Sequence, residues 1–137
     1  MEYNDLFART ELLIGSEAMA AVASKRVILF GVGGVGSWCA EGLIRSGIMH
    51  LTLVDSDRVA VANVNRQMPA TTRTVGELKV EVLKRRLEEI NPQAVISAIP
   101  EIYSAASADS FHLAQYDYII DAIDSLSHKM HLLLTAS

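Results

Sequence analysis

The chain has 137 residues, of which half are hydrophobic and a fifth are charged, and its formal net charge is −4. These values are typical of one folded globular domain and exclude an intrinsically disordered chain. The acidic balance gives no general attraction to nucleic acids or to anionic membranes. Cys39 is the only cysteine, which excludes an internal disulfide and a cysteine zinc site. Because no leader and no apolar run near the roughly 18 residues of a membrane span is found, we expect a cytoplasmic protein that does not enter a membrane.

The N-terminal residues are expected to form a helical arm. The segment from Asn4 to Ser24 mixes polar and apolar residues and predicts short helices that are broken at Gly15. Ser16 is the expected N-cap of the helix that follows this break. We therefore divide the chain into an arm over residues 1–24 and a nucleotide-binding domain over residues 25–137.

The remainder alternates short apolar runs with helical patterns. The clearest helix covers residues 76–90, where Val80, Leu83 and Leu87 share one face and Asn91-Pro92 ends the pattern. Strands are predicted over 26–30, 50–54, 94–99 and 118–122, and further helices over 37–45, 106–115 and 125–136, the last with Ser125 as N-cap. This alternation predicts an α/β fold, a Rossmann-like doubly wound parallel sheet that is truncated after about four strands and is incomplete at its C-terminal end.

A glycine-rich turn follows the first predicted strand. Gly31, Gly33, Gly34 and Gly36 form a G-x-G-x-x-G pattern between a strand and a helix, where the backbone and the helix N-terminus bind phosphate. Asp55 lies 24 residues after Gly31, at the end of the second predicted strand, where a carboxylate binds ribose hydroxyls. Both NAD and ATP carry this ribose, so these residues alone leave the nucleotide open.

Four later motifs resemble one family in order and in spacing. They are Asp55-Ser56-Asp57, Asn63-Val64-Asn65-Arg66-Gln67, Val75-Gly76-Glu77-Leu78-Lys79 and Asp121-Ala122-Ile123-Asp124-Ser125. The chain resembles the ThiF/HesA/MoeB superfamily of ubiquitin-activating-enzyme-like adenylating proteins from about Phe7 to Leu134. Within that superfamily it is most similar to the tRNA threonylcarbamoyladenosine dehydratases. This resemblance implies ATP-dependent activation of a carboxylate on a tRNA adenosine, followed by cyclisation.

The resemblance also implies a role for individual residues. Arg66 and Lys79 would contact the phosphates of ATP, and Asn63 would bind or orient them. Asp124 would hold Mg²⁺, and Arg9 would reach the ATP site of the partner subunit in a homodimer. The implied catalytic residues are therefore Arg66, Lys79, Asp124 and Arg9. The implied nucleotide-binding residues are Gly31, Gly33, Gly34, Gly36, Asp55, Asp57, Asn63, Arg66, Gln67 and Lys79.

Two other functions stay open at this point. The first is an adenylyltransferase that activates a ubiquitin-like sulfur-carrier protein, although members of that group usually carry Asn where this chain has Ser125. The second is a NAD-binding oxidoreductase or regulatory Rossmann module, in which Arg66, Lys79 and Asp124 would have no task.

The tRNA reading conflicts with the charge of the chain. Binding to tRNA requires a basic surface, and the run Lys84-Arg85-Arg86 is expected to form salt bridges with Glu81, Glu88 and Glu89 instead. Either the RNA-binding surface lies in sequence after Ser137, or tRNA is not the partner. We expect the chain to be the N-terminal part of a longer enzyme, with the ATP-site framework but with impaired turnover or none.

Overall fold

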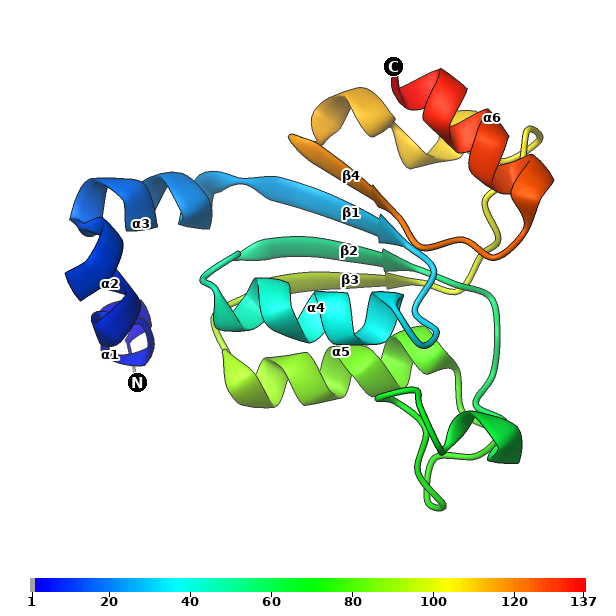
Figure 1. Cartoon of the computed structure of the whole chain (residues 1–137), viewed down its shortest axis with the longest axis horizontal. Coiled ribbons are helices and arrows are strands. Elements are labelled where there is room, and N and C mark those ends of the chain that lie inside the picture. The colour runs from blue at the N-terminus through cyan, green and yellow to red at the C-terminus, as the bar shows by residue number, and fades with distance from the viewer. Residues whose placement is uncertain (1) are drawn as a thin grey trace.

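A computed structural model describes residues 2–137 as one parallel sheet with helices on both faces (Figure 1). The strands are β1 (Arg26–Phe30), β2 (His50–Val54), β3 (Val95–Ile99) and β4 (Tyr118–Asp121), and their order across the sheet is β3-β2-β1-β4. All three strand pairs are parallel. The predicted doubly wound α/β fold is confirmed.

The helices α4 (Gly36–Arg45) and α5 (Lys79–Ile90) cover one face of the sheet, and α6 (Leu126–Ala136) covers the other (Figure 1). The alternation of strand side chains produces these two layers. Val27, Leu29 and Leu51 point into the core beneath α4 and α5, whereas Ile28 and Phe30 join the layer that contains Leu132 of α6.

Three short helices precede the sheet: α1 (Tyr3–Leu6), α2 (Ala8–Ile14) and α3 (Ser16–Ser24). The predicted break at Gly15 is confirmed, but Gly15 itself is the N-cap of α3, and Ser16 is the first helical residue. The Tyr3 hydroxyl donates a hydrogen bond to the Gly47 carbonyl at 2.9 Å, which ties the helices to the loop between α4 and β2. The boundary between an arm (1–24, of which Met1 lies outside the described residues) and a domain stays a prediction. None of the helices in residues 2–137 is long and apolar enough to cross a membrane.

Two predicted helices differ from the structure. The helix expected over 76–90 begins at Lys79, because Gly76 has a φ of +92° and Leu78 pairs with Arg58 in a short antiparallel bridge. The prediction of one helix over 106–115 is wrong. That segment forms two 3₁₀ helices, η2 (Ala108–Phe111) and η3 (Leu113–Gln115), separated by His112 with a φ of +51°.

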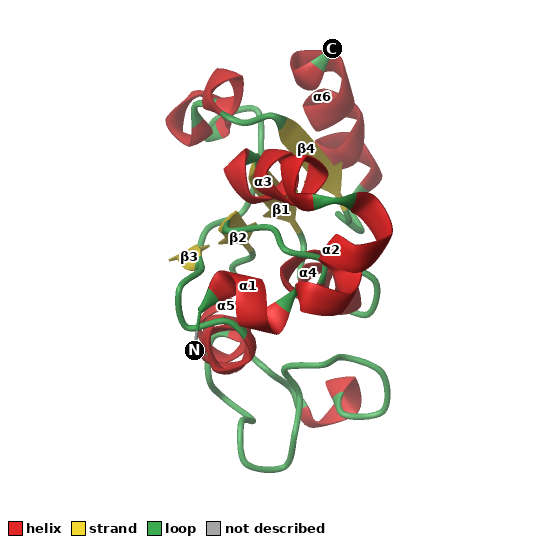
Figure 2. Cartoon of the chain, turned by 90° about the vertical axis from the view of Figure 1, so that its left-hand side faces the viewer, coloured by secondary structure: helices red, strands yellow, loops and turns green. Residues whose placement is uncertain are grey.

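The connection after β2 is a long loop that contains the 3₁₀ helix η1 (Val61–Asn63) and stands away from the sheet and its helices (Figure 2).

The strand order decides where a ligand binds. The chain runs from β1 to β2 and β3 on one side and returns to place β4 on the other side of β1. Ligands of such sheets bind at the carboxyl ends of the strands where the order reverses, here between β1 and β4.

Candidate functional site

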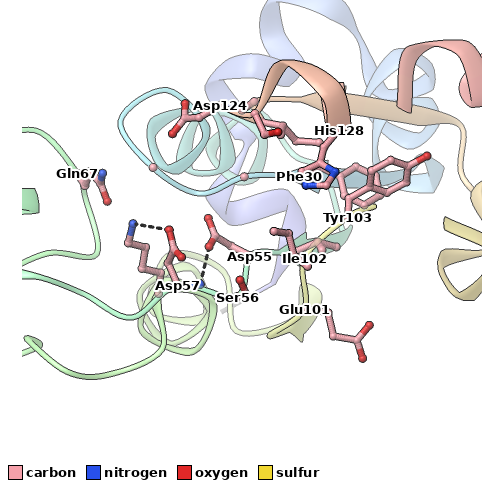
Figure 3. Close-up of a pocket in the computed structure, with 17 residues that line it drawn as sticks. Phe30, Asp55, Ser56, Asp57, Gln67, Glu101, Ile102, Tyr103, Asp124 and His128 are labelled. Atoms are coloured by element: carbon pink, nitrogen blue, oxygen red, sulfur yellow. Dashed lines mark hydrogen bonds and ion pairs between the residues drawn. The ribbon is translucent and has the colours of Figure 1, made fainter. Parts of the chain in front are cut away.

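A pocket of about 230 Å³ lies at the carboxyl ends of all four strands. Its walls come from the segments that follow each strand: Gly31 and Gly33 after β1, Asp55 to Asp57 after β2, Glu101 to Tyr103 after β3, and Ala122 to Ser125 after β4. Figure 3 shows Asp55 and Asp57 on one wall, with Asp124 and His128 opposite. The pocket therefore lies at the reversal point that the topology predicts.

Two of the glycines are required by the loop itself. A Cβ on Gly31 would overlap the backbone of Ala122, and the φ of Gly31 is +93°. A Cβ on Gly36 would overlap the carbonyl of Gly31. At Gly33 and Gly34 the nearest heavy atoms lie at 3.5 and 3.9 Å, which is ordinary contact. Only a ligand would require glycine at these two positions.

Asp55 connects the end of β2 to the glycine loop. Its Oδ2 accepts a hydrogen bond from the backbone N–H of Val32 at 2.9 Å, and its Oδ1 accepts one from the N–H of Asp57 at 2.8 Å. Each carboxylate oxygen has a second lone pair. The carboxylate is therefore fixed in position and retains acceptor capacity for the hydroxyls of a sugar.

Lys79 brings a buried positive charge to the pocket. Its side chain is only 7 % exposed, and its Nζ lies 3.6 Å from Oδ2 of Asp57, which is 69 % exposed (Figure 3). The two side chains form an ion pair, but their separation is too long for a hydrogen bond. In the described chain no hydrogen bond occupies the ammonium, so its three N–H donors are available to a ligand.

A second pocket adjoins the first, and Gly33, Gln67 and Asp124 line both. Arg66 lies on its wall, where its Nη1 donates hydrogen bonds to the Ala62 carbonyl at 3.0 Å and to Oδ1 of Asn65 at 2.9 Å. These bonds fix the guanidinium and leave most of its five donors unused.

Gln67 is buried between the two pockets. Its Nε2 would lie 3.5 Å from a Cβ on Gly33. Its Oε1 has no hydrogen-bond partner within residues 2–137. A buried amide without a partner is costly. A hydrogen-bond donor at this position, from a ligand or a water molecule, would remove this cost.

Asp124 is exposed at the junction of the two pockets and follows β4 by three residues. Its neighbour Asp121 has a structural role instead: Oδ1 accepts from the N–H of Ile123 at 3.0 Å, and Oδ2 pairs with Nζ of Lys129 at 2.6 Å. Across residues 2–137 no three His, Cys, Asp or Glu side chains form a ready metal cluster. Asp124 could supply one oxygen ligand to a cation that phosphates and water also coordinate.

The far end of the first pocket is apolar. Tyr103 packs edge-on against Phe30, with ring centroids 5.1 Å apart, and stacks on Phe111. The Tyr103 hydroxyl lies 2.8 Å from Nδ1 of His131 on α6. Figure 3 shows His128 beside this aromatic group, so the pocket joins a flat apolar end to a polar, charged end.

Comparisons with known proteins show the family of this chain. Residues 7–136 match the ThiF family. The chain belongs to the ThiF family. It is 42 % identical over 127 residues to the tRNA threonylcarbamoyladenosine dehydratase of Bacillus subtilis. This alignment covers 93 % of this chain and 50 % of that protein. It is 33 % identical over 112 residues to the sulfur carrier protein adenylyltransferase of Thermus thermophilus, covering 82 % of this chain and 41 % of that protein.

The similarity extends to a solved structure of this family. The crystal structure of E. coli tRNA N6-threonylcarbamoyladenosine dehydratase in complex with ATP superposes with a TM-score of 0.93 at 37 % identity. That match covers 96 % of this chain and 54 % of the other. The ThiF-family chain thus spans about half the length of the curated relatives it matches.

Most of the predicted site residues of this ThiF-family chain lie around the two pockets. They are Gly31, Gly33, Gly34, Asp55, Asp57, Arg66, Gln67, Lys79 and Asp124. Gly36 lies beneath the loop. The Oδ1 of Asn63 accepts from the N–H of Ala60 at 2.9 Å in η1, outside both pockets. Arg9 is exposed on α2, which lies towards the amino ends of the strands and away from both pockets (Figure 1). The roles of these residues stay predictions.

Two features of the site were missed or misjudged in the sequence. Lys129, which the sequence analysis did not select, lines the second pocket. Its position in the first turn of α6, eight residues after Asp121, was the signal that could have found it. The helix arginines form salt bridges as expected, but with other partners: Arg85 pairs with Glu77 and Arg86 with Glu41. Sequence spacing along one helix could not show a partner on α4.

Proposed function

We propose that this chain forms the ATP-binding part of an enzyme that activates a carboxylate by adenylation. Its substrate in the full-length protein is threonylcarbamoyladenosine in tRNA, which the enzyme cyclises. The observation that carries this proposal is the convergence of a glycine loop, the carboxylate of Asp55 and the buried Lys79 on one pocket at the reversal point of the sheet. The similarity to a dehydratase crystallised with ATP supports ATP as the ligand of this pocket.

ATP fits the polarity of the pocket. Asp55 would accept hydrogen bonds from the ribose hydroxyls, and the aromatic end near Tyr103 has the flat apolar surface that an adenine requires. The triphosphate would extend over Gly33 and Gly34 towards Arg66, with the ammonium of Lys79 alongside. Gln67 would donate its NH₂ group, whose nitrogen would lie 3.5 Å from a Cβ on Gly33, to a phosphate oxygen above the glycine loop.

Mg²⁺ suits the acidic surroundings of this triphosphate. Asp55, Asp57, Glu101 and Asp124 all line the first pocket, so a free tetra-anion would meet several carboxylates. Magnesium is usually held by one or two carboxylates together with phosphates and water. The exposed carboxylate of Asp124, at the junction of the pockets, would be the protein ligand, and bound Mg²⁺ would neutralise charge on the phosphates.

The chemistry requires positioning more than covalent help from the protein. A substrate carboxylate oxygen attacks the α-phosphorus, the bond to pyrophosphate breaks, and an acyl adenylate forms. A neighbouring group of the same substrate then attacks the acyl carbon and expels AMP, which closes the ring without a protein nucleophile. Arg66 and Lys79 would stabilise the charge that develops on the phosphates.

The complete enzyme would be a cytoplasmic homodimer in this proposal. Arg9 lies on α2, near the amino ends of the strands and away from the pocket, so its side chain could serve a nucleotide only in a partner subunit. A two-fold dimer would make each site composite. Activation of a sulfur-carrier protein is the alternative, and the lower identity to that group makes it the second choice.

Nucleotide binding tests the proposal directly. Calorimetry should show that the chain binds Mg·ATP and does not bind NADH. Arg66→Ala should weaken ATP binding by about 10- to 100-fold, the value of one or two hydrogen bonds to charged groups. Arg73→Ala is the matched control, because Arg73 lies on the same loop outside both pockets. NADH binding without ATP binding would overturn both adenylation functions.

A further inference from the structure

The loop after β2 carries a local positive charge in an acidic chain. Its residues Arg58–Gly76, here named the arginine loop, contain three arginines and no Asp, Glu or Lys, a formal charge of +3. The chain as a whole carries −4, and this total conceals the local excess. The loop projects from the sheet and its helices on the side of the carboxyl ends of the strands (Figure 1), and residues at these ends line the first pocket.

No acidic side chain neutralises these arginines. Arg58 donates to the Gly76 carbonyl at 3.0 Å, Arg66 donates to Ala62 and Asn65, and all three guanidinium groups lie on exposed residues. In the described part of the chain none of Arg58, Arg66 and Arg73 forms an ion pair. On α5, by contrast, Arg85 and Arg86 each pair with a glutamate at 2.8 Å.

The loop is a rigid support for these charges. Its two ends are joined by hydrogen bonds from Val59 N–H to the Glu77 carbonyl and from Gly76 N–H to the Val59 carbonyl, both at 2.8 Å. Val59 and Ala70 pack with Val82 of α5 in a small separate core. The loop is thus ordered before any partner binds, which lowers the entropy cost of recognition.

The anchoring of Arg66 links the loop to the nucleotide pocket. The Trp38 Nε1–H donates to the Arg66 carbonyl at 3.1 Å, and Met68 N–H donates to the Ser37 hydroxyl at 3.2 Å. These two bonds hold the inner part of the loop against α4. Arg66 faces the second pocket, whereas Arg58 and Arg73 lie outside both pockets on exposed parts of the loop.

We propose that the arginine loop binds the phosphodiester backbone of the RNA substrate, with Arg58 and Arg73 as its phosphate contacts. This inference rests on the proposed function, and it places an RNA-binding surface on this chain. Exposed guanidinium groups without acidic partners are the side chains that bind phosphates best. A backbone held here would place a modified adenosine next to the ATP site.

RNA binding at varied salt tests this assignment. The probe is unfractionated bacterial tRNA, and binding is measured by fluorescence anisotropy from 25 to about 200 mM salt, a range over which phosphate contacts are strongly weakened. For Arg58→Ala/Arg73→Ala we expect at least a tenfold weaker affinity at the lowest salt. The slope of log affinity against log salt should fall by about 1.5, since each phosphate contact contributes about 0.7–0.9. The control is Arg85→Ala/Arg86→Ala, which changes the net charge equally but removes arginines already paired with acids.

The control decides the outcome. Equal losses in the two double variants would mean that net charge alone governs binding and would overturn the assignment. Absence of tRNA binding by the unaltered chain would overturn it as well. Neither result affects Mg·ATP binding, measured separately by calorimetry, so failure of the loop assignment is distinguishable from failure of the adenylation proposal.

Discussion

Asp55 and Val32 join the ends of two neighbouring strands through one hydrogen bond, 2.9 Å from the Val32 nitrogen to Oδ2 of Asp55. The carboxylate that we propose for ribose binding thus also holds the glycine loop in place. Val32 is fully buried, so its N–H has no access to water as a substitute partner.

Asp55→Ala should therefore reduce stability as well as nucleotide binding. It leaves the N–H groups of Val32 and Asp57 without their acceptor, and we expect the free energy of unfolding to fall by about 1–3 kcal/mol. Urea titration measures this change, and hydrogen exchange of the Val32 amide reports the local loss of protection. Unchanged exchange at Val32 would show that the carboxylate does not hold the loop.

Alanine at the loop glycines should separate folding from binding. Gly31→Ala and Gly36→Ala place a Cβ against the backbone of Ala122 or of Gly31, and each should cost at least about 2 kcal/mol of stability. Gly33→Ala meets only ordinary contacts and should leave the unfolding midpoint nearly unchanged while it weakens ATP binding. A Gly33→Ala variant that binds ATP normally would place the phosphates elsewhere.

Lys79→Met should weaken ATP binding by about 10- to 100-fold with little loss of stability. The side chain is buried, but its acidic partner Asp57 is exposed and can be solvated when the lysine is removed. Calorimetry of ATP binding and a urea titration measure the two effects. Lys84→Met, on the same helix and outside the pockets, is the matched control. Equal ATP affinity in both variants would exclude Lys79 from the phosphate site.

The Cys39 thiol should react slowly with alkylating reagents. Burial raises the pKa of Cys39, so at each pH between about 7 and 9 the folded protein holds less thiolate than a free cysteine does. The expected pH profile of alkylation is shifted upward, and the protein should lose some stability as the pH rises above the pKa of the unfolded thiol. The same protein in urea gives the reference rate. A folded rate equal to that reference would contradict the assignment of Cys39 as a partly buried thiol.

Local pattern was sufficient for the sheet and for the main elements of the site. The strands β1 and β2 have the predicted bounds, because their apolar runs are short and end at strong turn residues. Gly31, Gly33 and Asp55 line the pocket as expected, because they follow strands whose carboxyl ends meet there, while their binding roles stay predictions. By contrast, the sequence pattern over 106–115 is compatible with one helix. In the structure the segment is divided at His112, and the preceding residue, Phe111, packs against Phe30 and Tyr103.

The sequence by itself therefore determined which residue types are present and which strand end each of them follows. Tertiary structure decided which of their charges are free. Arg85 and Arg86 are neutralised by Glu77 and by Glu41, the latter 45 residues away along the chain, whereas Arg58 and Arg73 have no acidic partner in the described chain. Ion pairing depends on distance in space, which the spacing of residues along one helix or loop does not specify.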